Sequence, residues 1–247
     1  MDMLRPAPLT LVTSCRQEQA WNQAQLEKTV IDPAWQLSAY QTPGLVLGCS
    51  QRNAIGTIRE PAGIDVVSRQ AGGGAVLVGP WMLSASVVLP NAHALVSGNL
   101  VASYRWLGEL YASLLQDLGM AAHAITPEEA KQLQQAAPAG LGWACYGGFS
   151  PWEVVVGSRK VVGLAQVRRR TGVLLVAGLL LDRPDWPLLV AAMDKPVPHA
   201  ALLEDGTTSC AEQIGRNLPL PEIASPLADA LQNAIGHSGD AASPAFK

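Results

Sequence analysis

The sequence predicts an α+β fold, in which groups of mixed or antiparallel β-strands alternate with helices. Three observations support this class. Residues 83–89 place Leu, Ala, Val and Leu at every second position, which is the period of a β-strand. Residues 100–118 place apolar side chains three and four positions apart, as a helix does, and Gly119 follows as a stop. Residues 153–181 contain three apolar runs joined by two turns, which is the pattern of a three-stranded meander.

The other elements follow from the same periodicities and from turn residues. Further strands are expected at residues 9–13, 35–40, 45–48, 65–68 and 75–78. Ser14 stands at the N-cap of a helix with a mixed face. Three more helices are expected at residues 127–137, 185–193 and 226–235. No internal repeat interrupts this order, and a doubly wound sheet is not indicated.

The length and composition indicate one domain. The chain has 247 residues, of which 49% are hydrophobic, and only 15% are charged. This composition can bury one substantial core and does not resemble that of a disordered chain. We expect a single catalytic domain over residues 1–236, followed by a flexible tail at residues 237–247, which are small and polar.

The residue composition and charge of the chain argue against several classes of protein. The net charge is −3, so the chain lacks the overall positive charge that is typical of nucleic-acid-binding proteins. The four cysteines and four histidines are scattered, without the spacing of a zinc site or a disulfide framework. The N-terminus lacks the apolar stretch of a signal peptide, and the longest apolar run, residues 173–181, is about half a membrane span. We therefore expect a cytoplasmic protein that binds no metal, membrane or nucleic acid.

A glycine-rich segment is the first candidate for chemistry. It reads Arg69-Gln70-Ala71-Gly72-Gly73-Gly74-Ala75-Val76. Three glycines at a bend between strands expose main-chain N–H groups, so that a carboxylate, phosphate or thioester can approach closely. Arg69 can act as an anion clamp. The alternative is a tight bend beside an incidental arginine, and the segment matches neither common phosphate-loop pattern.

A lysine and a cysteine are the second and third candidates. Lys160 follows a hairpin turn and could be held against a reacting carbonyl, although an exposed lysine at a strand edge is the commoner case. Cys145 lies in a loop rich in glycine and aromatic residues, where a thiolate could accept an acyl group. The alternative for Cys145 is a small buried hydrophobic residue, and that interpretation is adopted for Cys15, Cys49 and Cys210.

A run of three arginines, Arg168, Arg169 and Arg170, is expected on the turn before the last meander strand. A solvated charge run is the ordinary interpretation. The functional interpretation is a docking patch for an acidic carrier protein, because charges at the rim of an interface speed encounter.

Together these segments resemble the lipoate–protein ligase and octanoyltransferase family. The likeness rests on the Arg69–Val76 segment and on the stretch from Cys145 through Pro151-Trp152-Glu153 to Arg159-Lys160-Val161-Val162-Gly163 and Ala165-Gln166. It implies a biotin/lipoyl ligase-like fold with a mixed sheet and flanking helices. Because little chain follows Pro226, we expect no separate C-terminal accessory domain such as some ligases carry. It also implies catalytic roles for Cys145 and Lys160, with Lys160 on the acyl carbonyl. The implied acyl-binding residues are Arg69, Gly72, Gly73, Gly74, Ala75, Val76, Gly163 and Ala165.

The resemblance leaves three hypotheses open. In the preferred one, octanoyl passes from acyl carrier protein to Cys145 and then to a lysine of a lipoyl domain, without a bound cofactor. In the second, the chain is a ligase that uses free lipoate, ATP and magnesium. In the third, it is a non-catalytic relative that binds acylated carriers. Many relatives carry histidines where this chain has Val78 and Val176, which bears on substrate choice.

Overall fold

The protein is described by a computed structural model that covers residues 10–12, 14–56, 58 and 64–239. These residues form a seven-stranded sheet and a three-stranded sheet. The order in the larger sheet is β1 (Thr10–Val12), β2 (Ala34–Tyr40), β6 (Met82–Leu89), β10 (Gly172–Leu180), β9 (Arg159–Arg169), β8 (Val154–Val156) and β7 (Ala122–Ala124). The order in the smaller sheet is β4 (Asp65–Ser68), β3 (Gly44–Leu47) and β5 (Val76–Val78).

Both sheets are mixed, as the sequence predicts. The pairs β1–β2 and β3–β4 are parallel, and the other strand pairs are antiparallel. The meander of residues 153–181 is present as consecutive strands β8, β9 and β10. The predicted α+β class is confirmed.

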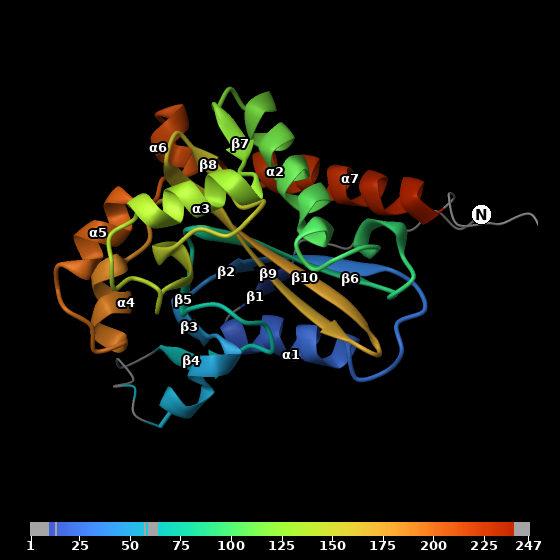
Figure 1. The fold of residues 1–247 in the computed structure, drawn as a ribbon, viewed down its shortest axis with the longest axis horizontal. Helices are drawn as coiled ribbons and strands as arrows, with labels where there is room; N and C mark the ends of the chain where they lie inside the picture. Colours follow the sequence, from blue (N-terminus) through green and yellow to red (C-terminus); the bar gives the residue numbers. More distant parts are fainter. Residues whose placement is uncertain (1–9, 13, 57, 59–63, 240–247) are drawn as a thin grey trace, which may run out of the picture.

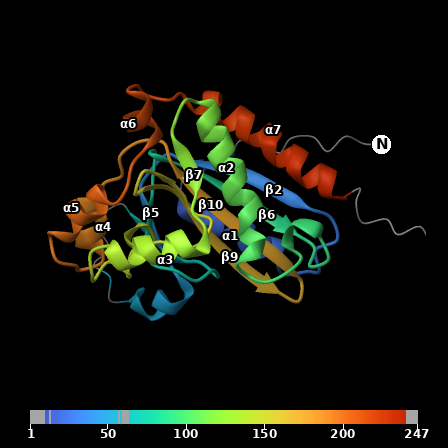
Figure 2. The ribbon, with the colours of Figure 1, turned by 45° about the horizontal axis from the view of Figure 1, so that its top comes forward.

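The helices cover the larger sheet from both sides, as Figures 1 and 2 show. Their bounds are α1 Cys15–Gln25, α2 Arg105–Asp117, α3 Pro127–Ala136, α4 Trp186–Ala192, α5 His199–Asp205, α6 Cys210–Ile214 and α7 Leu220–Gly239. Short 3₁₀ turns occur at η1 Cys49–Ala54, η2 Ala94–Val96, η3 Ala102–Tyr104 and η4 Cys145–Gly147. Helices α2 and α7 lie over one face, whereas α1 and the smaller sheet lie over the other.

Strand β6 shows why layers form on both faces of the larger sheet, because it supplies apolar side chains to each face. All of its residues are buried, and its side chains alternate between two cores. Leu83, Ala85, Val87 and Leu89 point into the core that α2 and α7 complete. Met82 packs instead with the smaller sheet and α4, and Val88 packs with α1. Since the strand period is two, the polar pair Ser84 and Ser86 lies on this second face.

The structure corrects several predicted boundaries. Strand β9 runs to Arg169, so Arg168 and Arg169 lie on a strand rather than on the turn. Helix α7 begins at Leu220, contains Pro226 and extends to Gly239, which includes residues expected in the tail. Strand β7 and helices α5 and α6 were not predicted. Leu9 and Thr13, the ends of the first expected strand, lie outside the described residues.

Two further findings concern the class of protein. None of the helices in the described ranges combines the length and hydrophobicity that a membrane crossing requires. Within those ranges, no cluster of three or more His, Cys, Asp or Glu side chains could hold a metal ion.

Candidate functional site

A cavity of about 300 Å³ lies between the central strands of the larger sheet and the layer formed by α1 and the smaller sheet. Its apolar wall comes from Val46, Val67, Val76, Val78, Met82, Leu174 and Val176. Helix α1 contributes a polar wall that consists of Arg16, Glu18, Gln19, Asn22 and Gln23. Arg69, Cys145 and Tyr146 also line the cavity, so reactive side chains and an apolar wall share one space.

Arg69 organises the glycine-rich loop. Its side chain is only 9% exposed. Its Nη2 donates to the carbonyl oxygens of Gly72 at 2.8 Å and of Gly74 at 3.1 Å. Gly73 has a φ of +92°, and a Cβ there would lie 2.8 Å from Nη2 of Arg69. The loop therefore needs glycine at position 73, both for its backbone conformation and to leave room for the guanidinium.

None of the three glycines is among the residues that line the cavity. Gly72 and Gly73 are exposed at the rim, and Gly74 is buried against the main chain of Trp143 and Ala144. Ala75 is also buried and pairs with Ala144, whereas Val76 lines the cavity. Acyl contact by Gly72, Gly73, Gly74 and Ala75 therefore stays a prediction.

Cys145 is held beside this loop by main-chain hydrogen bonds. Its N–H donates to Ala75 O at 2.9 Å, and Ala75 N–H donates to Trp143 O at 2.7 Å. The half-buried thiol lines the cavity, and its Sγ lies 3.7 Å from Nη2 of Arg69. The guanidinium therefore places a positive charge in contact with the sulfur, which would be the nucleophilic atom. Arg69 and Cys145, which are separate candidates in the sequence and lie 76 residues apart, therefore meet at the cavity.

Lys160 is enclosed rather than exposed. Its side chain is 1% exposed, and its Nζ lies 2.7 Å from Oε2 of Glu153, which is 2% exposed. Nζ also donates to Cys145 O at 3.0 Å and faces the rings of Tyr146 and Phe149. The alternative of a solvated lysine at a strand edge is therefore wrong. Lys160 contacts the turn that carries Cys145, and its contact with an acyl carbonyl stays a prediction.

Tyr146 connects this turn to the sheet. Its hydroxyl donates to Gly178 O at 2.6 Å, and its ring packs against Trp186. Burial raises the pKa of Tyr146 well above its usual value, so the phenol stays neutral. Gly178 allows this approach, because a Cβ there would lie 2.9 Å from the tyrosine oxygen. The predicted residues Gly163 and Ala165 both line the cavity next to it.

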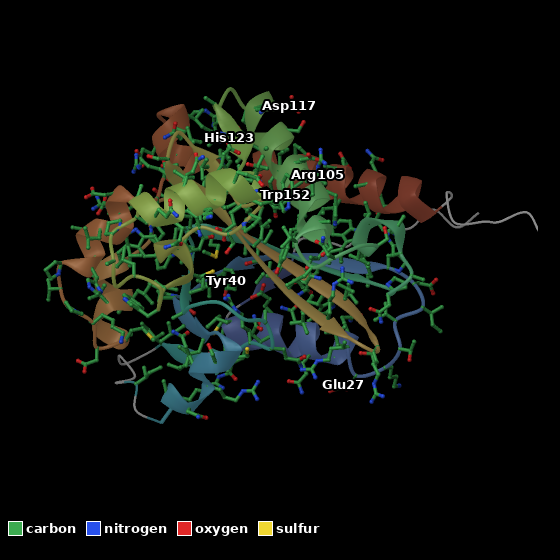
Figure 3. All side chains as sticks on the ribbon, in the orientation of Figure 1. Glu27, Tyr40, Arg105, Asp117, His123 and Trp152 are labelled. Carbon is green, nitrogen blue, oxygen red and sulfur yellow. The ribbon has the colours of Figure 1, made fainter. Side chains whose placement is uncertain are left out.

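A buried acid on the cavity wall was not predicted. Glu18 is 2% exposed and accepts a hydrogen bond of 2.6 Å from Tyr40, whose hydroxyl also lies 2.7 Å from Ser84 Oγ. Burial raises the pKa of Glu18. Figure 3 places Tyr40 in the interior, between α1 and the larger sheet. The available signal was that Glu18 and Asn22 are four residues apart on one helix and so share a face.

The two valines at the expected histidine positions both line the cavity. Val78 and Val176 belong to its apolar wall. The cavity therefore presents hydrocarbon where an imidazole could have supplied a proton. Such a wall suits an aliphatic acyl chain.

The arginine run lies at the far end of β9. Arg168 donates to Val96 O at 2.7 Å. The carbonyl oxygens of Arg169 and Arg170 accept hydrogen bonds from the Asn91 side chain. All three arginines are exposed. They are therefore available to a partner, although Arg168 also stabilises the fold.

Comparisons with known proteins identify the family. The lipoyl protein ligase A/B catalytic domain model matches residues 15–232. An octanoyltransferase LipM from Kyrpidia tusciae is 30% identical over 214 residues, which cover 83% of this chain and 77% of that protein. An octanoyltransferase LipM from Exiguobacterium sibiricum is 33% identical over 193 residues, which cover 73% and 66%.

Solved structures support the same fold. A lipoate–protein ligase A bound with ATP superposes with a TM-score of 0.67 at 17% identity, over 92% of this chain and 84% of that one. The bipartite lipoate protein ligase of Thermoplasma acidophilum gives a TM-score of 0.66 at 17% identity, over 92% and 82%. The predicted ligase-like fold is confirmed. The family model over residues 15–232, the sequence relatives and the fold agree, and the chain belongs to the lipoyl protein ligase A/B catalytic domain family.

Proposed function

We propose that this protein is an octanoyltransferase that carries the acyl group on Cys145 and delivers it to a lysine of a lipoyl domain. The observation that carries this proposal is the contact between Arg69 and Cys145, which both line a cavity with an apolar wall. The LipM names of the relatives support it.

The reaction consists of two acyl exchanges. In the first, the Cys145 thiolate attacks the thioester carbonyl of octanoyl-acyl carrier protein, the C–S bond of the donor breaks, and the carrier thiol leaves with a proton. In the second, the lysine amine attacks the new thioester, an amide forms, and Cys145 is released as the thiol. Each bond formed replaces one broken, so neither ATP nor a bound cofactor is required.

The roles of the other residues follow from their positions. The apolar wall that contains Val78 and Val176 receives the acyl chain. Arg69 stabilises the thiolate, both when it attacks and when it leaves. Lys160 and main-chain N–H groups of the glycine-rich segment stabilise the oxyanion. Gly163 and Ala165 border the chain near Cys145.

A lipoate ligase that uses ATP is the second candidate. The exposed Gly72 and Gly73 favour it, because main chain without side chains beside Arg69 could receive a phosphate. In that case free lipoate is the donor, ATP is consumed with magnesium, and Cys145 is dispensable. The acceptor is a lipoyl-domain protein in both cases. A free thiol nucleophile also fits a reducing compartment such as the cytoplasm.

The acyl donor that the protein accepts distinguishes the octanoyltransferase from the lipoate ligase. A purified lipoyl domain is incubated with the protein and either octanoyl-acyl carrier protein alone or lipoate with ATP and magnesium, and its mass is followed. We expect acylation with the first donor and none in the Cys145→Ala variant. Acylation that requires ATP and survives Cys145→Ala would establish the ligase. No acylation by either donor would favour the non-catalytic relative.

A further inference from the structure

Glu153 is the centre of a buried hydrogen-bond cluster beneath the Cys145 turn. Its Oε2 lies 2.7 Å from Nζ of Lys160 and accepts the N–H of Ser150 at 2.8 Å. Its Oε1 accepts the N–H of Leu164 at 3.3 Å. Buried ion pairs persist when their remaining lone pairs and protons are satisfied, and here the carboxylate has a partner on each oxygen.

The β8–β9 hairpin places the two charges together. The pairing of β8 with β9 is irregular between Val154 and Val155. A bulge of this kind redirects a side chain without ending the sheet. Lys160 is fixed further through its main chain, because its N–H donates to Gly206 O and its carbonyl accepts from Thr208 N–H, both at 2.9 Å. The lysine therefore leaves the strand from a rigid point.

The ammonium reaches from this point to the main chain of Cys145. Its hydrogen bond to Cys145 O is 3.0 Å long, and the Tyr146 and Phe149 rings face it at 5.6 and 5.5 Å. An ammonium has three N–H donors. One is directed to Glu153 and one to Cys145 O, so that a third can serve an acyl oxygen.

We propose that Glu153 is a positioning residue that acts through Lys160. Its carboxylate places a counter-charge 2.7 Å from the buried ammonium and directs that ammonium to the turn that carries the Cys145 thiol. Without this carboxylate, the lysine side chain loses the partner that fixes its position. It then holds the carbonyl of Cys145 less firmly and provides less stabilisation for an acyl oxyanion. This inference deepens the proposed function and rests on it for the acyl step alone.

The test is a double-mutant cycle in which the alkylation rate of Cys145 is measured. Iodoacetamide alkylation of Cys145 is followed by intact mass and peptide mapping in the wild type, Glu153→Gln, Lys160→Met and the double variant. We expect Glu153→Gln to change the alkylation rate at least about fivefold in the wild-type background and less than about twofold in the Lys160→Met background. Similar effects in both backgrounds, or none in either, would overturn the proposal.

A matched control separates this role from general destabilisation. Glu212 pairs with Arg159, the neighbour of Lys160, but this pair lies at the surface. Glu212→Gln should leave the alkylation rate unchanged. Should Glu153→Gln fail to fold, Glu153→Asp provides the test, because it keeps the charge with a shorter reach. It should give a rate between those of wild type and Lys160→Met, and a wild-type rate would contradict the proposal.

The acyl step gives a second readout. If the wild type transfers octanoyl, Glu153→Gln should lower kcat at least about tenfold with little change in KM for the lipoyl domain. Glu153→Asp should restore part of the lost kcat. A wild-type kcat in Glu153→Gln, or a change confined to KM, would contradict the role. If the wild type shows no transfer, the alkylation cycle still decides the positioning role, because it needs no acyl donor.

Discussion

Nη2 of Arg69 lies 3.7 Å from Sγ of Cys145, and the same guanidinium holds the carbonyl oxygens of Gly72 and Gly74. One side chain thus shapes the glycine-rich loop and contacts the thiol. The contact links the two segments that carry the family resemblance.

Replacing Arg69 should therefore act on the thiol more than on the fold. Arg69→Met keeps a similar volume but removes the positive charge beside the attacking sulfur. We expect alkylation of Cys145 to slow about tenfold or more, with a loss of about 1–3 kcal/mol in unfolding free energy from the broken hydrogen bonds. Alkylation rates at neutral pH and chemical denaturation measure the two effects. A wild-type rate in the folded variant would contradict this role of Arg69.

Gly73→Val should block acyl binding without unfolding the protein. The residue has a φ of +92°, and its Cβ would press on Arg69 Nη2 and lie 4.0 Å from Cys145 Sγ. The strain should cost about 1–3 kcal/mol, which most domains survive. Calorimetric titration with an octanoyl donor or lipoate measures the loss of binding. Gly119→Val is the control, because Gly119 also has a positive φ, of +83°, but a Cβ there meets no atom within 4 Å. Equal affinity in both variants would refute the prediction.

Replacing Lys160 should lower the free energy of unfolding, whereas replacing an exposed lysine at a strand edge would not. Lys160→Ala leaves the buried Glu153 without its cation, which costs about 3–5 kcal/mol. Adding Glu153→Gln should recover much of that loss but not the acyl transfer. Urea denaturation of the single and double variants, with a transfer assay beside it, checks both parts. A single variant as stable as wild type would show that the pair contributes little.

The arginines at the end of β9 should assist carrier docking. Arg169 and Arg170 are exposed, whereas Arg168 also bonds Val96 O. The variant Arg169→Glu with Arg170→Glu should therefore slow transfer to a lipoyl domain at low salt and weaken its salt dependence, because rim charges act on the encounter rate. Arg216→Glu, on another exposed segment, is the control. Equal rates at low salt for wild type and the double variant would remove the docking role.

Periodicity and turn residues were sufficient for most strands of the two sheets. The sequence selected Arg69 and Cys145 as separate candidates, but their contact across 76 positions was not predicted. The strands of the meander alternate clearly, and the glycine-rich segment required a bend. Periodicity was insufficient for α5 and α6, which have seven and five residues and complete at most about two helical turns. The burial of Lys160 was missed for a related reason. Residues 206–208, which pair with the main chain of Lys160, follow Lys160 by more than forty positions. No local sequence pattern predicts that contact.

Glu18 shows a second limit of the sequence. Glu18 belongs to the first turn of α1, and its carboxyl lies inside the protein, where it accepts a hydrogen bond from Tyr40. Only the packing of α1 on the larger sheet identifies which face of this largely polar helix is buried. A pattern based on hydrophobicity cannot recognise a buried face that is itself polar.

Intact-mass spectrometry of the protein with octanoyl-acyl carrier protein alone shows whether Cys145 carries the acyl group. We expect one octanoyl group per chain, released by hydroxylamine as a thioester is, mapped to Cys145 and absent in Cys145→Ala. A chain that stays unmodified with this donor, yet labels a lipoyl domain from lipoate and ATP in the Cys145→Ala variant, would contradict it.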